Sequence, residues 1–238
     1  SIILGYKENI NEQYDKLINY EKQIERIQKN LEDYEVKLNK YSSVLSNKRK
    51  NIALMLENML SKELSELSME NVKFKVNFEK KNNFSSTGID NIEFLISTNP
   101  GEPLKPISKI VSGGEMSRIM LGFKSIIANN DKIPTMIFDE IDTGISGRTA
   151  QVVGEKIKRI SKNHQVISIS HLPQIAALAD SHYEISKEVI NGKAQTKINK
   201  LSDDERIIEL ARLLGGVNVT ETTLQHAKEM IEMSKEIK

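Results

Sequence analysis

Apolar residues recur every seven positions along the first 67 residues of the chain. No glycine or proline interrupts residues 6–67. The a positions of this heptad pattern are aliphatic, whereas the d positions three residues later are half polar. The a positions are Ile10, Leu17, Ile24, Leu31, Leu38, Leu45 and Ile52, and the d positions are Gln13, Tyr20, Ile27, Tyr34, Tyr41, Lys48 and Met55. Because an α-helix rises 1.5 Å per residue, the pattern predicts one coiled-coil helix about 90 Å long.

A helix that packs along a globular body is the alternative explanation of this seam. The rest of the chain is too short to cover a seam of such length, which favours the coiled coil. Acidic and basic side chains are equally frequent in the segment, so we expect a solvated arm rather than a DNA-binding stripe. The chain holds no second heptad segment. The arm, residues 1–67, is therefore expected to pair with another chain or with a further part of a longer protein.

Residues 68–238 mix strand and helix patterns and predict an α/β domain. Residues 72–78 and 91–98 alternate apolar and polar side chains, as half-buried strands do. Residues 183–189 and 193–198 predict a hairpin around Asn191 and Gly192. Helical patterns are expected at residues 112–128, 150–160 and 173–179, after Ser202 up to Gly215, and from Thr220 onward. The expected fold class is a mostly parallel sheet with flanking helices, joined to one long coiled-coil helix.

An unbroken apolar run, Thr135 to Phe138, leads directly into the adjacent carboxylates of Asp139 and Glu140. A run of this kind, entered from Pro134, predicts a strand buried on both faces of a parallel sheet. Ligands bind at the carboxyl ends of strands in open α/β sheets. Helix capping or a solvated loop end would also explain an Asp-Glu pair, so the pair alone leaves the function open.

A second apolar strand pattern, residues 165–170, ends in His171. The helix pattern between the two strands has the length of a crossover connection, which makes the strands parallel. Both strands then end at the same edge of the sheet. Although a lone histidine after a strand is usually a surface residue, topology places His171 beside Asp139 and Glu140.

Two glycines stand in the first turn of the helix predicted after Ser112. Ser112 and Glu115 match a capping box, which is a purely structural reading. That reading does not explain Gly113 and Gly114, since each glycine costs roughly 0.5–1 kcal/mol in a helix relative to alanine. Paired glycines allow a group to approach the backbone closely, and the free N–H groups of a helix N-terminus suit phosphate.

Composition restricts the function classes further. The 238 residues carry 28% charged side chains and a net charge of +1, which gives no global attraction to nucleic acid. The absence of cysteine excludes disulfides and thiolate metal sites. No apolar run reaches the roughly 18 residues of a membrane span, and we expect a cytoplasmic protein without a membrane partner. A start without Met, directly in a repeating pattern, is expected of a piece of a longer protein.

Together these motifs resemble the ABC-type ATPases. VSGGEMSR (residues 111–118) is similar to the ABC signature, and residues 136–140 are similar to Walker B with its catalytic glutamate. Gly144-Ile145-Ser146 lies where the D-loop belongs, and His171 where the switch histidine belongs. The fuller wording IFDEIDTGISGRTA (137–150), ISHLPQIAALAD (169–180) and ERIIELARLLGG (205–216) resembles the bacterial RecN family, SMC-like proteins of recombinational DNA repair. The resemblance covers essentially the whole chain.

The resemblance implies ATP and Mg²⁺ as cofactors and a role for each motif. Asp139 would hold Mg²⁺, Glu140 would activate the attacking water, and His171 would contact the γ-phosphate. The signature would clamp a nucleotide held by the opposite head, with the D-loop beside it. The residues implied at the nucleotide are Ser112, Gly113, Gly114, Glu115, Arg118, Asp142, Gly144 and Ser146.

The same resemblance implies partners. No G-x-x-x-x-G-K-[ST] motif occurs in the chain, so the phosphate cradle and its lysine are expected on an N-terminal Walker A lobe of the same native protein. We also expect a second head, with which the protein forms a homodimer, and DNA as a further partner. The expected location is the nucleoid. The isolated chain is expected to be inactive as an ATPase. Two alternatives stay open: a structural coiled-coil module with a degenerate nucleotide fold, and another ABC-type ATPase, cohesin-like or a transport subunit.

Overall fold

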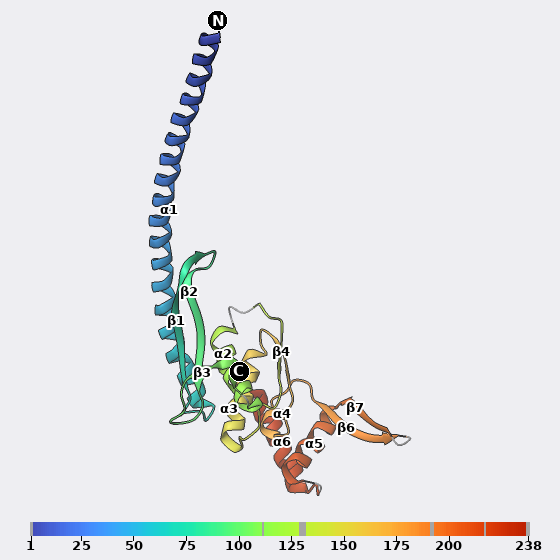
Figure 1. Ribbon diagram of the computed structural model, residues 1–238. Coiled ribbons are helices and arrows are strands. Elements are labelled where there is room, and N and C mark those ends of the chain that lie inside the picture. Colours follow the sequence, from blue (N-terminus) through green and yellow to red (C-terminus); the bar gives the residue numbers. More distant parts are fainter. Residues whose placement is uncertain (1, 111, 129–131, 191–192, 217, 237–238) are drawn as a thin grey trace. The chain divides into compact units, whose positions relative to one another are not determined.

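The computed structural model describes residues 2–110, 112–128, 132–190, 193–216 and 218–236. Figure 1 labels most of the helices and strands along the chain. The elements are α1 (Ile2–Glu66), β1 (Lys73–Ser85), β2 (Gly88–Ser97), β3 (Lys105–Pro106), the 3-10 turn η1 (Ile107–Lys109), α2 (Gly113–Ile127), β4 (Thr135–Phe138), α3 (Gly147–Ile160), β5 (Gln165–Ser168), α4 (Pro173–Ala176), β6 (Tyr183–Ile190), β7 (Lys193–Lys200), α5 (Asp203–Gly215) and α6 (Glu221–Glu236).

The chain forms two compact units. The first, which we call the arm unit, comprises Ser1–Met55 and Asn77–Glu93. The second, the body unit, comprises Leu56–Val76 and Phe94–Lys238. This division differs from the boundary expected after residue 67. The reason is that the distal half of the β1–β2 ribbon packs on the arm helix, whereas the last turns of that helix pack in the body.

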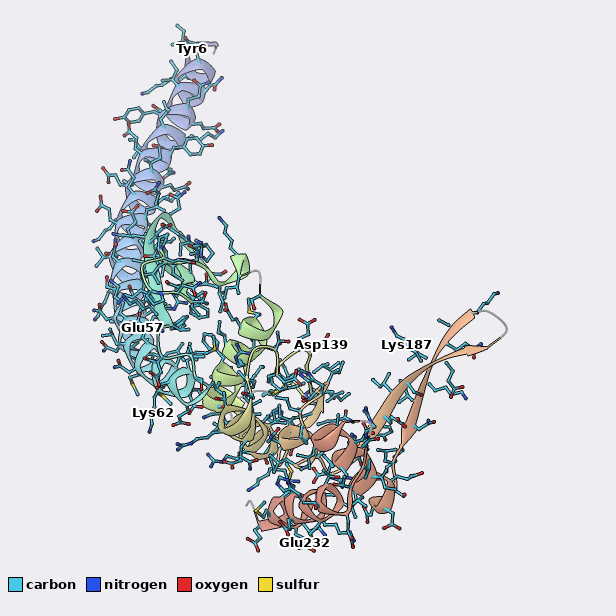
Figure 2. All side chains as sticks on the ribbon, turned by 90° about the horizontal axis from the view of Figure 1, so that it is seen from below. Tyr6, Glu57, Lys62, Asp139, Lys187 and Glu232 are labelled. Atoms are coloured by element: carbon cyan, nitrogen blue, oxygen red, sulfur yellow. The ribbon has the colours of Figure 1, made fainter. Side chains whose placement is uncertain are left out.

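Helix α1 is unbroken over 65 residues, as its freedom from glycine and proline after Gly5 predicts. Figure 2 shows side chains projecting from every side of its N-terminal half, around the labelled Tyr6. The a positions of the heptad pattern are exposed, for example Leu17 at 63% and Ile24 at 54%. Pairing of this seam in a coiled coil stays a prediction. Among the described helices, none is long and apolar enough to cross a membrane.

In the arm unit, β1 and β2 lie alongside α1 (Figure 1). The helix presents small side chains on one face, since Ser42, Ser46 and Ala53 are all buried. Ser46 Oγ donates to Asp90 of β2 at 2.8 Å, and Arg49 pairs with the same carboxylate at 3.0 Å. Burial would raise the pKa of Asp90, but these two hydrogen bonds outweigh it and hold the pKa below its ordinary value. The carboxylate therefore stays charged and fastens the ribbon to the helix.

The body unit contains the expected parallel strands. β4 and β5 pair in register from Thr135 opposite Gln165 to Phe138 opposite Ser168, with α3 as the crossover. The prediction of an α/β fold with a long helix is confirmed. In the described residues the parallel pairing that we expected is limited to a two-stranded sheet, β4 and β5. The pairs β2–β3 and β6–β7 are antiparallel.

The body core is built on the last turns of α1. Leu60 and Leu64 are fully buried and lie against Gly122 of α2, where an added Cβ would stand 3.2 Å from Leu60 Cδ1. Phe74, Phe94 and Phe123 form an aromatic cluster in the same unit, with ring centroids 5.2–6.0 Å apart. The glycine lets α2 approach α1 closely. Helix α2, which begins at the candidate signature, is therefore fixed to the last turns of α1 (residues 60–66), which we call the arm root although they belong to the body unit.

The C-terminal elements match the sequence pattern closely. Ser202 and Glu205 form the predicted capping box at the start of α5, and Thr220 Oγ1 accepts from the backbone N–H of Thr223. The predicted hairpin is confirmed as β6 and β7, which pair from Tyr183–Lys200 to Ile190–Lys193; its turn at Asn191 and Gly192 lies outside the described residues. Helices α5 and α6 share a core around Leu210, Ala211 and Ala227.

One buried cation joins the arm root to α3. The ammonium of Lys156 lies 2.6 Å from Glu63 and 2.7 Å from Glu66, with only 6% of its side chain exposed. Burial disfavours the charged ammonium, but the hydrogen bonds to both carboxylates outweigh it and raise the pKa of Lys156. The hydrogen bond from Lys156 likewise lowers the pKa of Glu66 below its ordinary value. Lys156 and Glu66 are therefore charged at neutral pH.

Replacing Lys156 by Met should lower the free energy of unfolding by about 1.5–3 kcal/mol at pH 7, because two carboxylates lose a charged hydrogen-bond donor. A depressed folded-state pKa of Glu66 contributes stability above its ordinary pKa and loses it as the pH falls through the folded value. The difference between the wild type and Lys156→Met should therefore shrink in acid. Urea unfolding at several pH values measures it. Lys162→Met, an exposed position just after α3, is the matched control, and an equal effect there would contradict the assignment.

Candidate functional site

The candidate catalytic residues predicted from the sequence lie just after the ends of β4 and β5. Asp139 and Glu140 follow β4 directly, and His171 stands three residues beyond β5. The parallel register brings Phe138 opposite Ser168, and Ile169 N–H donates to Phe138 O at 3.0 Å. The side chain of Asp139 is labelled in Figure 2. The structure thus brings the two carboxylates and the histidine to one edge of the sheet, as the crossover topology requires.

Asp142 connects the loop after β4 to the loop after β5 at this edge. Its carboxylate is only 3% exposed and receives three donors. Ser170 Oγ donates at 2.6 Å, the His171 backbone N–H at 2.7 Å, and His171 Nδ1 lies at 2.9 Å. An imidazole whose Nδ1–H is held by a carboxylate presents its Nε2 outward in a fixed tautomer. The His171 side chain is 73% exposed, so its free nitrogen faces solvent.

The backbone at Glu140 is held in an unusual conformation. Its φ of 53° lies in the left-handed region, which non-glycine residues rarely adopt. The residue opens a tight turn, in which the Thr143 N–H donates to Glu140 O at 3.1 Å. Such strain persists only where surrounding contacts over-determine it, and it is common at functional sites.

Those surrounding contacts come from the first turn of α2. An added Cβ at Gly113 would stand 2.6 Å from Glu140 Oε2, and one at Gly114 would stand 2.8 Å from Thr143 Cβ and 3.0 Å from Glu140 O. The glycine pair is thus explained by close approach, as the sequence suggested. The group that approaches is the loop after β4 of the same chain.

Further side chains of α2 fix the same loop. Ser117 Oγ donates to Asp139 O at 2.6 Å. Arg118 is buried, and its guanidinium donates to Thr143 O at 2.7 Å and to Ile141 O at 3.5 Å. Burial lowers the pKa of Arg118, with the charge of Glu115 acting the other way. A contact of Arg118 with a nucleotide stays a prediction, since in this structure its guanidinium serves the loop.

Ser112 and Ser146 lie at the N-termini of two helices, and Gly144 lies in the turn after β4. Ser112 caps α2 by accepting from the Glu115 N–H at 3.4 Å, which is the first half of the expected capping box. Gly144 has a φ of +75° with open space around it, so the turn itself requires a glycine there. Ser146 is the N-cap residue of α3 without a side-chain cap bond.

The donor set fits a magnesium ion only in part. Among the described residues, no group of three or more His, Asp or Glu side chains is arranged to hold a metal ion. Mg²⁺ bound with a nucleotide commonly takes one or two carboxylates, with waters and phosphate oxygens as the other ligands. Asp139, exposed at the end of β4, offers one such oxygen ligand, and the phosphates would have to supply the rest.

Sequence reasoning missed the residues that position the site. Ser117, Thr143 and Ser170 were not singled out, and Asp142 was expected at the nucleotide rather than at His171. A signal did exist for Ser170 and Asp142. The topology that brings His171 to Asp139 also brings the neighbours of both residues together, and a buried Asp needs donors. A nucleotide contact of Asp142 stays a prediction.

Sequence comparison identifies relatives of this chain. No protein-family model matches it. The chain is 44% identical over 240 residues to the DNA repair protein RecN of Halalkalibacterium halodurans, which covers 99% of this chain and 42% of that protein. It is 39% identical over 251 residues to the DNA repair protein RecN of Bacillus subtilis, covering 99% of this chain and 44% of that protein.

Solved structures give a weaker likeness. The crystal structure of the Smc head domain with a coiled coil and joint from Pyrococcus yayanosii is 21% identical, with a TM-score of 0.45, and the match covers 80% of this chain and 32% of that one. The relationship rests on the sequence identities. The chain is a relative of the RecN DNA repair proteins and spans 42–44% of the length of the two relatives named here.

Proposed function

We propose that this chain provides the catalytic carboxylates, the switch histidine and the signature of an ATP-hydrolysing, SMC-like protein of DNA double-strand break repair. A Walker A lobe of the same native protein would bind the nucleotide phosphates, and a second head would complete each site. The observation that carries the proposal is the meeting of Asp139, Glu140 and an Asp142-held His171 at the ends of two parallel strands.

Each residue has a task that its position supports. Asp139 would hold Mg²⁺, which neutralises phosphate charge when bound. Glu140 would be the general base for the attacking water, because its exposed carboxylate follows Asp139 directly at the end of β4. His171 would contact the γ-phosphate through Nε2, while Asp142 fixes the ring. Phosphoryl transfer depends chiefly on such positioning and on charge neutralisation.

The packing of Glu140 against Gly113 sets a condition on this mechanism. With Glu140 Oε2 in front of the first turn of α2, a phosphate at that turn would meet a carboxylate of like charge. Glu140 must therefore turn toward its own nucleotide before Ser112 and the two glycines receive the nucleotide of the opposite head. The two motifs then serve different nucleotides, as the trans arrangement requires.

Replacing Glu140 by Gln in a head completed by the Walker A lobe should leave ATP binding intact. The amide keeps the size and hydrogen bonds of the side chain but cannot take a proton. ATP hydrolysis should fall by roughly 10²–10⁴-fold, the range of general-base catalysis, and ATP-bound dimers should accumulate. A phosphate-release assay with size-exclusion chromatography measures both. The control is Glu155→Gln on α3. Unchanged hydrolysis in Glu140→Gln would exclude this base, whereas a completed wild-type head that does not hydrolyse ATP would favour a degenerate nucleotide fold.

Replacing Asp142 by Asn should reduce ATP hydrolysis in the completed head by about 10–100-fold, because charge-assisted hydrogen bonds to His171 and Ser170 worth about 1.5–3 kcal/mol are weakened. ¹⁵N NMR of the imidazole should also report a loss of the Nδ1–H tautomer at His171, which a general loss of stability does not cause. Asp180→Asn, which alters an exposed pair with Lys158, should change neither. A normal tautomer in Asp142→Asn would contradict the positioning role.

A further inference from the structure

The charge of helix α1 is distributed unevenly. Residues 36–56 carry five cations and no carboxylate: Lys37, Lys40, Lys48, Arg49 and Lys50. Acidic residues outnumber basic ones between residues 8 and 35. The balance over the whole arm, which suggested a merely solvated helix, therefore hides a basic block. The block lies where the arm unit is widest, beside the β1–β2 ribbon (Figure 1).

Part of this block lies on a single face of the helix. Lys40, Ser43, Asn47 and Lys50 follow one another at spacings of three, four and three residues, which places them on one side of an α-helix. In the heptad pattern they occupy c and f positions, opposite the a and d seam. A coiled-coil partner on the seam would therefore leave this face open. All four side chains are exposed.

The ribbon completes this face with one more cation. A hollow of about 250 Å³ lies between helix and ribbon, lined by Ser43, Asn47 and Lys50 on α1 and by Lys80 on β1, with Ser46, Phe78, Glu79, Ile89 and Asp90 around them. Of the two carboxylates of the hollow, Asp90 binds Ser46 and is paired with Arg49, whereas Glu79 accepts from the neutral amide of Asn91 and adds one negative charge at the border. In the described part of the chain, Lys40, Lys50 and Lys80 form no ion pair.

We propose that the face formed by Lys40, Ser43, Asn47, Lys50 and Lys80 binds the phosphate backbone of double-stranded DNA. The inference rests on the proposed function for the choice of DNA as the polyanion. Lysines interspersed with hydroxyl and amide donors are the groups that contact phosphate oxygens without reading sequence. Lys40 and Lys50 stand about 15 Å apart along the helix axis, a span of about four base pairs at 3.4 Å per step.

The fixed ribbon gives this face its shape. The Ser46–Asp90–Arg49 contacts hold Lys80 beside the helix, so that cations from two elements border one hollow. Because Arg49 is paired with Asp90, we do not count it among the residues proposed to bind DNA.

The test compares two triple variants in DNA binding without nucleotide. The first is Lys40→Gln, Lys50→Gln and Lys80→Gln; the control is Lys16→Gln, Lys22→Gln and Lys29→Gln, three exposed lysines in the acidic half of α1. Both lose three charges, and circular dichroism checks that both stay helical. A labelled duplex of fixed sequence is titrated by fluorescence anisotropy between about 50 mM and 200 mM salt, the range over which phosphate contacts weaken steeply.

The first triple should bind at least about tenfold more weakly at low salt, and its plot of log K against log salt should be shallower by about 2–3, the loss of three phosphate contacts. The control should bind as the wild type does. Equal losses in both triples, or unchanged binding in the first, would overturn the inference, as would a wild-type chain that does not bind duplex DNA. Because no ATP is used, failure here is separate from failure of the proposed hydrolysis, which the Glu140→Gln assay decides.

Discussion

The carboxylate of Asp142 joins the two strand ends on which the site is built. It accepts from Ser170, from the His171 backbone and from the His171 ring. A buried carboxylate with three donors is stable, whereas one that loses them bears an uncompensated desolvation cost. The loop after β4 and the loop after β5 are thus obliged to remain together. Together with the pairing of β4 and β5, this group sets the relative placement of the loops that carry Glu140 and His171.

A second set of contacts ties that loop to the rest of the body unit. Arg118 and Ser117 reach from α2 to the carbonyls of Thr143 and Asp139. Gly122 brings the same helix against Leu60 and Leu64 of the arm root, and Lys156 fastens α3 to that root through Glu63 and Glu66. The helices that precede and follow β4 and its loop, α2 and α3, are therefore anchored to the last turns of α1. Events at the loop and at the arm root share one packed network.

The sequence predicted those features that follow from local pattern. Uninterrupted heptads predicted α1, the Asn191-Gly192 pair predicted the β6–β7 hairpin, and Ser202 with Glu205 predicted a cap. The crossover argument placed His171 beside Asp139. It did not predict that Asp142 binds His171 or that Arg118 binds the loop. Sequence spacing does not determine which way a side chain points when it could face either solvent or a buried partner.

The extent of the arm unit was missed for a similar reason. Ser42, Ser46 and Ala53 read as polar or small residues on an exposed helix, and only the ribbon packed on them reveals a contact face.

The glycine pair at the start of α2 also has a mechanical meaning. Side chains between two packed elements act as soft spacers, because a change of rotamer absorbs a small displacement. Gly113 faces the movable carboxylate of Glu140, but at Gly114 there is no such spacer, and the backbone of α2 stands directly against the backbone of Glu140 and Thr143. A shift of α2 by a fraction of an ångström therefore has no slack to take up before it moves the loop. Movements of the first turn of α2 and of the loop after β4 are therefore directly coupled.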